Sequence, residues 1–501
     1  MNNEPLQHGG SEVYTLKYLE EDYSVTTNFM GPSQKGLNNV MKNISSINHY
    51  PPTDKKYFQK GLSFLKTQPA NIIWGNGASE LIDLTIRFLV KKFNYVSFSK
   101  GEETQFMEYE RTCLNNGLYS DNDKGDILII INPNNPTGKF MGSKNEYFLK
   151  MIDEKLNFGG SLIIDESMIF WLNKWEKESS MFNYILHEML EEKGANIFVV
   201  HSWTKIFSCT GIRFGSIWSL NPFLIKEIEN IQVPWSVNIL AYHYLEGCLD
   251  DKDYLIQTRD LTSIYRLQME EKLYNLFPFI SIYGEKFLSW LWIDLKSEDL
   301  VNKVYQKLYS KNILIRRGKI GYKKNTFIRL AVRNEEKNDI LFNCLEELKN
   351  NIFKPNVPFK IENDIIYGMV NIKYEYLLQH ENIINERKDN LKKYLENNDY
   401  FILPSIIACS KTLMIIDGHH RLDIYKEKNI KEIPVLLINY DSPNIWTHDM
   451  KPIDKDEIIE SAKSGWLLPP KSTKHMILDT KNVLRPLISI SVLIDLTNLQ
   501  N

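Results

Sequence analysis

Residues 127–138, Ile-Leu-Ile-Ile-Ile-Asn-Pro-Asn-Asn-Pro-Thr-Gly, join a run of apolar side chains to a turn of asparagines and prolines. A short apolar run without alternation is typical of a strand that is buried on both faces, as in a parallel sheet. The turn then lies at the carboxyl end of that strand, where open α/β sheets bind their ligands. Taken alone, the stretch also fits an ordinary connecting turn.

Two further apolar runs follow, Leu162–Ile164 and Ile197–Val200, each between longer amphipathic segments. This alternation predicts an α/β fold class, with a mostly parallel sheet covered by helices. Residues 222–260 have a helical pattern, and residues 265–350 resemble a smaller α+β unit. The smaller unit is expected to contain two strands and a closing helix, at Phe287–Ile293, Phe327–Val332 and Glu335–Asn350.

The composition is that of an ordinary globular protein: 501 residues, a net charge of -3 and 43% hydrophobic residues. Collagen-like and disordered classes are excluded, and the near-neutral charge gives no case for nucleic acid or an anionic membrane. The five cysteines have no metal-binding spacing, so we expect free thiols. We expect a cytoplasmic protein, because the sequence has no signal-peptide pattern and no long apolar run.

A glycine-rich turn, Gly75-Asn-Gly-Ala-Ser-Glu80, precedes a predicted helix at Leu81–Phe88. Free backbone N–H groups at a helix start can hold a phosphate, although such a turn is more often a tight connection. Asp165-Glu166 directly follows the second strand. A carboxylate at a buried strand end needs a cationic partner, and a protonated pyridine nitrogen would be one.

Ser202-Trp-Thr-Lys205 and Gly211-Ile-Arg-Phe-Gly215 follow the third strand. They place a lysine, two hydroxyls and an arginine at one strand end. Desolvation would lower the pKa of the lysine and free its amine to attack a carbonyl cofactor.

Together these segments resemble the fold-type-I pyridoxal-phosphate enzymes of the class I/II aminotransferase superfamily, over about residues 8–350. The resemblance implies that Lys205 binds the cofactor covalently, Asp165 pairs with the pyridine nitrogen and Asn135 bonds the ring hydroxyl. It implies a phosphate site made by Gly77, Ala78, Ser202, Thr204 and Arg213, and a ring stacked on Phe106 or Tyr109. It also implies a homodimer, and a large domain at residues 30–260 beside a small domain at 1–29 and 261–350.

A narrower resemblance is to threonine-phosphate decarboxylases, with histidinol-phosphate aminotransferases as near relatives. It rests on His8-Gly-Gly10, Thr27-Asn28, Tyr50-Pro51, Pro234–Asn238 and Phe327–Arg333. It implies that His8 and Asn28 contact the substrate. Arg329 and Arg333 lie on one face of an extended strand and suit a substrate with both carboxylate and phosphate. Met168 stands where many aminotransferases have a tyrosine, which favours decarboxylation without deciding it.

Residues 351–361 contain two prolines and little periodicity, which predicts a linker before a domain at residues 362–501. That domain is expected to be α+β. Its predicted elements are helices at Asn385–Asn397, Leu422–Lys428 and Asp456–Ser464, and strands at Leu413–Ile416 and Pro434–Ile438.

Within this domain, Ile416-Asp-Gly-His-His-Arg421 lies between a strand and a helix. With His380-Glu381 it resembles the free serine kinases built on a ParB-like domain. The resemblance implies that Glu381 removes the hydroxyl proton, while Asp417, His419 and His420 lie at the transferred phosphate. It places Arg421, Trp446, Lys471, Ser472 and Thr473 against the amino acid and the nucleotide. ATP or ADP with Mg²⁺ would be the donor, and no residue is assigned as a metal ligand.

The two resemblances combine into one prediction, a bifunctional enzyme that phosphorylates free threonine or serine and then decarboxylates the phosphoamino acid to an amino-alcohol phosphate. One alternative is an aminotransferase that acts on the same phosphoamino acid. Another leaves the C-terminal domain without catalysis, as a regulatory module that binds nucleotide or DNA.

Overall fold

The computed structural model describes residues 10, 13–98, 105–120, 125–277, 280–352, 357–396, 402–430, 432–448 and 450–495. The chain forms two compact units. The first contains residues up to 270 together with 282–294 and 309–339, and the second contains 271–281, 295–308 and the residues from 340 onward. None of the described helices is long and apolar enough to cross a membrane.

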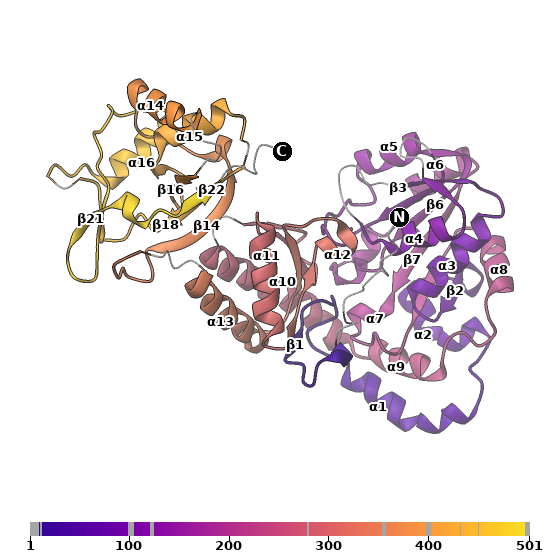
Figure 1. Ribbon diagram of the computed structural model, residues 1–501. Helices are drawn as coiled ribbons and strands as arrows, with labels where there is room; N and C mark the ends of the chain where they lie inside the picture. The colour runs from indigo at the N-terminus through magenta and orange to yellow at the C-terminus, as the bar shows by residue number, and fades with distance from the viewer. Residues whose placement is uncertain are drawn as a thin grey trace. The chain divides into compact units, whose positions relative to one another are not determined.

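The first unit is built on a sheet that has seven strands in the described part of the chain (Figure 1). In sheet order the strands are β2 (Ile72–Gly75), β8 (Gly215–Trp218), β7 (Asn196–Ser202), β6 (Leu156–Asp165), β5 (Gly125–Ile131), β3 (Tyr95–Phe98) and β4 (Tyr119–Ser120). The strands from β4 to β7 are parallel. β8 and β2 run antiparallel to their neighbours. The predicted, mostly parallel sheet is therefore confirmed.

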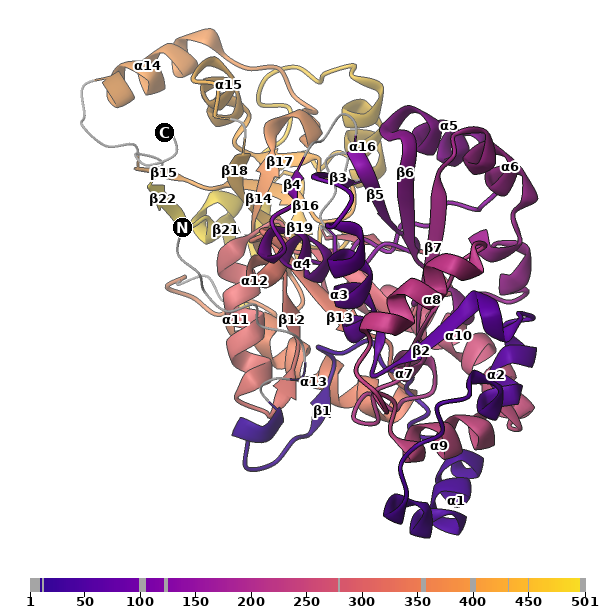
Figure 2. The same cartoon turned by 90° about the vertical axis from the view of Figure 1, so that its right-hand side faces the viewer.

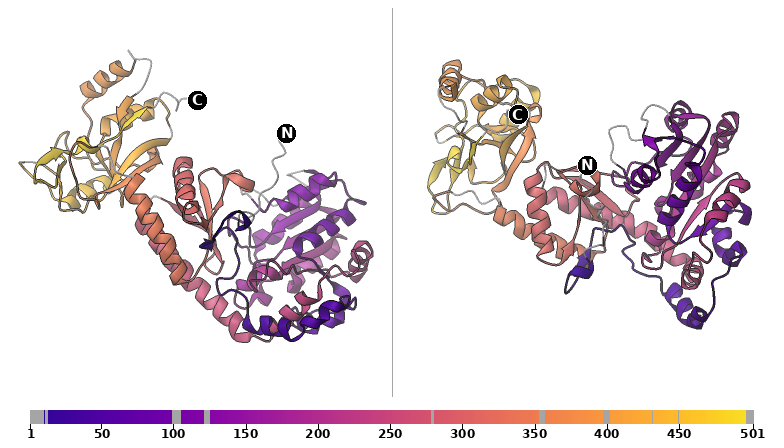
Figure 3. Two further views of the ribbon diagram at one scale, coloured as in Figure 1. Left: turned by 60° about the horizontal axis from the view of Figure 1, so that its bottom comes forward. Right: turned by 45° about the vertical axis from the view of Figure 1, so that its right-hand side comes forward.

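Helices cover both faces of this sheet (Figures 1 and 3). On one face lie α3 (Ala78–Leu89), α4 (Glu108–Asn115) and α8 (Pro222–Ile231), and on the other lie α5 (Glu146–Lys155) and α6 (Tyr184–Glu192). Ile127, Ile129 and Ile131 of β5 pack against the first set, while Leu128 and Ile130 pack in the second cluster. Successive residues of a strand point to opposite faces, so burial on both faces explains the unbroken apolar run.

The predicted helix at 222–260 is divided in the structure into α8, α9 (Ile239–Leu249) and the start of α10 (Lys252–Leu276). The break after α8 contains Pro234, which lacks a backbone N–H, and Trp235 with a φ of 57°. The remaining helices of the first 270 residues are α1 (Gln34–Lys42), α2 (Gln59–Phe64) and α7 (Trp203–Ile206).

A smaller sheet follows the main one along the chain, with the strand order β12 (Arg316–Arg317), β13 (Phe327–Ala331), β10 (Trp290–Asp294) and β9 (Ser281–Tyr283). A short pair joins β1 (Glu21–Asp22) to β11 (Ile313–Leu314). The helices of this region are α11 (Glu298–Tyr309), α12 (Lys319–Tyr322) and α13 (Glu335–Ile352). Both predicted strands and the closing helix are therefore confirmed, with shifted ends.

The C-terminal part of the second unit contains a mixed sheet in the order β14 (Ile366–Lys373), β18 (Glu432–Ile438), β16 (Ile406–Cys409) and β17 (Ile415–Asp417). Helices α14 (Asn385–Glu396) and α15 (His419–Glu427) pack together beside it (Figure 2). The other elements are α16 (Lys455–Ser464), β15 (Ile402–Pro404), β19 (Ile445–Trp446), β20 (Met476–Leu478), β21 (Leu484–Pro486) and β22 (Leu493–Asp495).

The three predicted helices of this region are confirmed, and α15 begins three residues earlier than expected. The predicted strands correspond to β17 and β18, whereas β14 and β16 were not predicted. Part of the predicted linker, residues 353–356, lies outside the described residues. The boundary at 351–361 therefore stays a prediction.

Candidate active site

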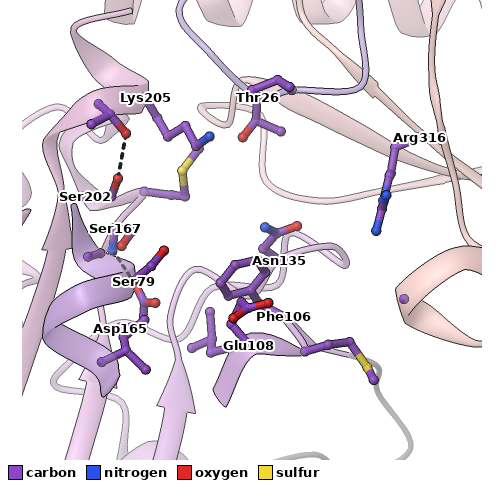
Figure 4. Close-up of a pocket in the computed structure, with 18 of the residues that line it drawn as sticks. Thr26, Ser79, Phe106, Glu108, Asn135, Asp165, Ser167, Ser202, Lys205 and Arg316 are labelled. Carbon is purple, nitrogen blue, oxygen red and sulfur yellow. Dashed lines mark hydrogen bonds between the residues drawn. The ribbon is translucent and has the colours of Figure 1, made fainter. Parts of the chain in front are cut away.

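A cavity of about 690 Å³ lies in the first unit at the carboxyl ends of β5, β6 and β7 (Figure 4). Charged, polar and aromatic side chains from many separate segments line it. They include Ser24, Thr26, Ser79, Phe106, Glu108, Arg111, Asn135, Asp165, Ser167, Ser202, Thr204, Lys205, Arg213, Arg316, Tyr322 and Arg329. Four arginines and a lysine against two carboxylates make the cavity suitable for an anionic ligand.

Lys205 lies in the short helix α7, directly after β7. Burial lowers the pKa of its amine to about 8, and the positive charges of Arg329 and Arg213 act in the same direction. A larger fraction of this amine is therefore neutral and nucleophilic near neutral pH than for an exposed lysine.

Asp165 ends β6 and is buried at the floor of the cavity. Its Oδ2 accepts a hydrogen bond from the Tyr109 hydroxyl at 2.8 Å, and its Oδ1 accepts one from the backbone N–H of Ser167 at 2.8 Å. Burial raises the pKa of this carboxyl, and the two hydrogen bonds oppose that rise. A cationic ring nitrogen would offset the cost of burying the charge.

The two candidates for stacking on the cofactor ring are separated by the structure. Phe106 lines the cavity, whereas Tyr109 is fully buried and bonds Asp165. The prediction that either ring could stack therefore narrows to Phe106. Tyr109 instead positions the carboxyl group, because its hydroxyl is committed to Asp165.

A candidate anion site lies at the start of α3. Gly77 precedes the helix with a φ of 82°, and a Cβ on it would come within 2.3 Å of an Arg213 guanidinium nitrogen. Ala78 and Ser79 line the cavity, and the hydroxyl oxygens of Ser202 and Thr204 lie 3.0 Å apart. A helix N-terminus, an arginine and these hydroxyls together fit a phosphate group.

Arg329 of β13 lines the cavity and has three hydrogen-bond acceptors. Its Nη1 donates to Asn135 Oδ1 at 2.6 Å and to the Tyr322 hydroxyl at 3.1 Å, and its Nη2 donates to the Ser24 carbonyl at 2.6 Å. Its Nε is buried without a hydrogen-bond partner in the described part of the chain. Since the Asn135 oxygen accepts from Arg329, the amide nitrogen of Asn135 is left to donate to a cofactor oxygen.

Two predicted substrate contacts are corrected by the structure. Arg333 does not line the cavity: it pairs with Glu21 at 2.8 Å and donates to four backbone carbonyls. Asn28 is also buried outside it, and its amide donates to Ile206, Tyr254 and Thr258. Both side chains hold the fold together. His8, another predicted contact, lies outside the described residues.

Sequence reasoning missed several residues that line the cavity, above all Arg316 and Tyr322. Arg316 of β12 lies opposite Arg329 in the antiparallel register, and its guanidinium lies 5.6 Å from the centre of the Tyr322 ring. The sequence signal was the Arg316-Arg317 pair just before Gly318. Its relation to Arg329 depends on a strand register that the sequence alone does not fix.

The predicted C-terminal site has two parts, and the first gathers around Glu381. Its Oε2 accepts from the Thr473 hydroxyl at 3.0 Å, and Thr473 also lies 3.1 Å from His380 Nε2. The second oxygen, Oε1, is buried without a partner among the described residues, as is the neighbouring Ser472 hydroxyl. Burial raises the pKa of the Glu381 carboxyl.

The second part is the motif at the start of α15, and its side chains largely bond one another or the backbone. Asp417 forms an ion pair with Arg421, which also donates to the carbonyls of Pro404 and Ser405. His420 accepts from the backbone N–H of Ile384 at 2.9 Å. The predicted contact of Arg421 with the substrate is therefore corrected to a contact that fixes the start of the helix.

The remaining predicted residues of this domain differ in exposure. His419 is buried against His380, with its Nε2 unpartnered among the described residues. Trp446 and Lys471 are exposed. In the described part of the chain, no group of three or more His, Cys, Asp or Glu side chains could hold a metal ion.

Comparison with known proteins agrees with the geometry of the first cavity. A family model, Aminotransferase class I and II, matches residues 22–345. A Caldanaerobacter subterraneus protein named "Putative threonine-phosphate decarboxylase" is 29% identical over 69% of this chain and 94% of its own length. A histidinol-phosphate aminotransferase of Methanosphaera stadtmanae is 23% identical over 67% of this chain and 95% of its own.

Among solved structures, the histidinol-phosphate aminotransferase of Clostridium acetobutylicum superposes with a TM-score of 0.57 at 25% sequence identity. The superposition covers 66% of this chain and all of that one. The family match ends at residue 345, so it carries no information on the C-terminal domain.

Proposed function

The chain belongs to the aminotransferase class I and II family of pyridoxal-phosphate enzymes, and on that premise we propose that it decarboxylates an O-phosphorylated hydroxy-amino acid. The substrate would be phosphothreonine or phosphoserine, and the product an amino-alcohol phosphate. The observation that carries the proposal is the pair of buried arginines, Arg316 and Arg329, in the same cavity as Lys205.

The cavity residues divide into those for the cofactor and those for the substrate. Lys205 would bind the cofactor, Asp165 would hold a proton at its ring nitrogen and Asn135 would donate to its ring oxygen. The Gly77 turn, Ser202, Thr204 and Arg213 would hold its phosphate. Pyridoxal phosphate, when bound, accepts the electrons that remain when a bond to the substrate Cα breaks.

Arg329 and Arg316 would hold the two anionic groups of the substrate. A guanidinium can bond a carboxylate or a phosphate through two parallel hydrogen bonds, which fixes direction as well as distance. Direction matters here, because the way these arginines hold the substrate would decide which of the bonds to its Cα is broken with the help of the cofactor. Two fixed guanidiniums could thus favour loss of the carboxylate.

Aminotransfer on the same substrate is the competing reaction. Met168 lines the cavity and has no hydroxyl to offer the cofactor ring, which favours decarboxylation. The test is product analysis of the purified enzyme with carboxyl-labelled phosphothreonine and phosphoserine. Labelled CO₂ supports the proposal, whereas a labelled 2-oxo acid with accumulating pyridoxamine phosphate overturns it in favour of aminotransfer.

The role of Arg316 has a matched control on the same strand. Arg317 is the next residue of β12 and does not line the cavity. Arg316→Ala should lower kcat/KM for the phosphorylated amino acid by about 10²-fold, because a bidentate anion contact is lost. Arg317→Ala should leave it nearly unchanged. Equal effects of the two substitutions would place the substrate phosphate elsewhere.

For the C-terminal domain we propose a kinase that makes this substrate by phosphorylating free threonine or serine. The observation that favours it is the Glu381 carboxylate, which is 12% exposed and whose Oε1 has no partner among the described residues and could accept a hydroxyl proton. ATP or ADP with Mg²⁺ would supply the phosphoryl group, and a ParB-like fold would provide the scaffold. Charge neutralisation and positioning supply most of the catalysis in such transfers.

A binding module without catalysis is the alternative for this domain. The purified protein would be incubated with ATP or ADP, Mg²⁺ and each amino acid, and the products identified by mass. Phosphothreonine or phosphoserine supports the kinase. Nucleotide binding without any phosphorylated amino acid would favour a regulatory module.

We also propose a homodimer formed through the first unit. Tyr50 and Trp235 stack on one another at 4.4 Å while remaining 77% and 50% exposed. Exposed stacked aromatics are typical of protein interfaces. Light scattering should give the dimer mass, and Trp235→Asp should shift it toward the monomer.

A further inference from the structure

The strongest unassigned feature is a hydrogen-bonded line of four groups behind the C-terminal carboxylate. Glu381 Oε2 lies 3.0 Å from the Thr473 hydroxyl, which lies 3.1 Å from His380 Nε2. His380 Nδ1 lies 2.7 Å from the carbonyl of Ile415. His380 is fully buried and Thr473 is nearly so.

This line has fewer hydrogen atoms than its contacts require. A carbonyl oxygen only accepts, so Nδ1 of His380 must carry the hydrogen, and Nε2 of the neutral ring is then an acceptor. Thr473 has one hydroxyl hydrogen for two acceptors, His380 Nε2 and an ionised Glu381. One of these two contacts therefore lacks a hydrogen until the line gains a proton.

The added proton can rest on the carboxyl or on the imidazole. Complete burial lowers the pKa of the His380 imidazole to about 4. Burial raises the pKa of the Glu381 carboxyl, and this rise outweighs the opposing hydrogen bonds from the Thr473 hydroxyl and from the backbone N–H groups of Ser472 and Thr473. Both effects place the proton on Glu381. The completed line then runs from Glu381 O–H to Thr473, from Thr473 to His380, and from His380 to Ile415.

The surrounding charges do not reverse this order. Asp417 faces Glu381 and its negative charge also raises the carboxyl pKa, although Arg421 is paired with that aspartate. His419 and His475 pack edge-on against the His380 ring, at 4.6 and 5.6 Å between ring centres. Each would disfavour a second positive charge there, and Lys455 acts on His475 in the same sense.

We propose that Thr473 and His380 are positioning residues that raise the proton affinity of Glu381, so that the three side chains hold one proton as a unit. This deepens, and for its catalytic use rests on, the proposed kinase function. In that reaction the substrate O–H bond breaks and its proton passes to Glu381. The substrate oxygen bonds to the transferred phosphorus as the bond from phosphorus to the nucleotide breaks. A half-turn of the carboxyl group brings the protonated oxygen to Thr473.

The test follows the protonation of Glu381 directly, without relying on turnover. Infrared spectra of the full-length protein across pH should show a carboxylic-acid band that Glu381→Gln removes. His380→Met leaves the Thr473 hydrogen permanently on Glu381, which favours the ionised form. Its proton affinity should fall about fivefold, the effect of one neutral hydrogen bond.

The same substitution in a Thr473→Val protein shows whether the shift depends on the link through Thr473 or on a general change in structure. In Thr473→Val the link to His380 is already broken, so adding His380→Met should cause no further change. Thr473→Ser keeps the hydroxyl and should titrate as the unchanged protein does. Equal shifts from His380→Met in both backgrounds, or no shift in either, would overturn the proposal.

A measurement on the unsubstituted protein covers the case in which His380→Met does not fold. Nitrogen NMR should find His380 with its hydrogen on Nδ1 and Nε2 bare while the Glu381 band titrates. Protonation of Nε2 in step with that band would overturn the proposal. If the carboxyl titration behaves as expected but no free amino acid is phosphorylated, the kinase function fails and the proton-holding unit stands.

Discussion

Two regions of this chain place a polar motif at the end of a strand and the start of a helix, and the motifs are used differently. At β7–α7 the motif residues Ser202, Thr204 and Lys205 line a cavity with side chains from many other segments. At β17–α15 the motif residues Asp417 and Arg421 pair with each other, and His420 bonds a backbone N–H.

The difference shows that a polar motif indicates a site only where its side chains remain available to a ligand. In the second region the unpartnered buried atoms belong largely to residues outside the helix start, Glu381 and Ser472, with His419 as the exception. The motif residues there fix the start of the helix, and the side chains that could take part in a reaction lie beside them.

The largest expected effect would test the first region. Lys205→Ala should abolish the yellow absorbance of the bound cofactor and lower decarboxylation on the order of 10⁴-fold or more. Absorbance spectra and product analysis would measure both losses. The phosphorylation that we propose for the C-terminal domain should survive the change. If the wild-type protein is colourless and cannot be reconstituted with pyridoxal phosphate, the first cavity is not a cofactor site and the comparison of the two regions fails.

The corresponding change in the second region is Glu381→Gln. It keeps the shape of the side chain and loses the proton acceptor, so phosphorylation should fall about 10² to 10⁴-fold while nucleotide binding persists. Asp417→Asn should differ, because it breaks the ion pair with Arg421 and should lower thermal stability as well. Supplying phosphothreonine or phosphoserine should bypass both variants. Full activity in Glu381→Gln would show that the carboxylate is not the base.

Arg329 and Arg333 are four residues apart and allow a cavity residue to be compared with a residue that holds the fold. Arg329→Ala should lower kcat/KM about 10²-fold with cofactor absorbance intact, because the proposed function gives Arg329 an anionic group of the substrate to hold. Arg333→Ala should instead lower the melting temperature, because Glu21 loses its partner and four carbonyls lose a donor. Kinetics paired with thermal melts would separate the two, and the reverse pattern would contradict the assignment.

A smaller effect concerns pH. The pKa of Lys205 is lowered to about 8, so its amine gains a proton as the pH falls below that value. Capture of pyridoxal phosphate by the apoenzyme should therefore rise with pH and level off above about 8, with a rate at pH 7 roughly a tenth of the plateau. Stopped-flow absorbance would measure it. Arg329→Ala removes a positive neighbour and should move the midpoint to higher pH, whereas a midpoint that does not move would show that the charge of Arg329 does not act on Lys205.

The smallest expected effect is that of Tyr322→Phe. The change removes the hydroxyl that bonds Arg329 and Asn135 and leaves the ring beside Arg316. One neutral hydrogen bond corresponds to about a fivefold change, which we expect mainly in KM. Arg317→Ala serves as a nearby control outside the cavity. An unchanged KM would show that Asn135 orients Arg329 without help from Tyr322.

Local pattern was enough to predict the sheet and the cofactor end of the cavity. The apolar runs that became β5, β6 and β7 are buried on both faces, and the groups predicted to hold the cofactor follow directly at their ends. Asp165 and Lys205 could thus be placed without any long-range information, because parallel strands align their carboxyl ends.

The substrate end could not be predicted in the same way. Arg316 meets Arg329 through an antiparallel register, and Tyr322 reaches both through a helix turn that contains Gly321 at a φ of 83°. Arg333 shared the strand pattern with Arg329, yet its carbonyl partners come from the segment between Asp22 and Thr27. Such pairings depend on tertiary packing, so the sequence pattern predicted the same role for both arginines.

Arg329 already has neutral acceptors on both terminal nitrogens: the Asn135 amide, the Tyr322 hydroxyl and the Ser24 carbonyl. Its Nε, by contrast, is buried without an acceptor in the described part of the chain, and Nη2 donates only to the Ser24 carbonyl there. In the proposed function, a carboxylate could therefore accept from the Nε–H and from the second hydrogen of Nη2 while the neutral bonds hold the guanidinium in place. A substrate amide or ester carries no charge and would form only the weaker neutral bonds there, so the arrangement would favour a free acid.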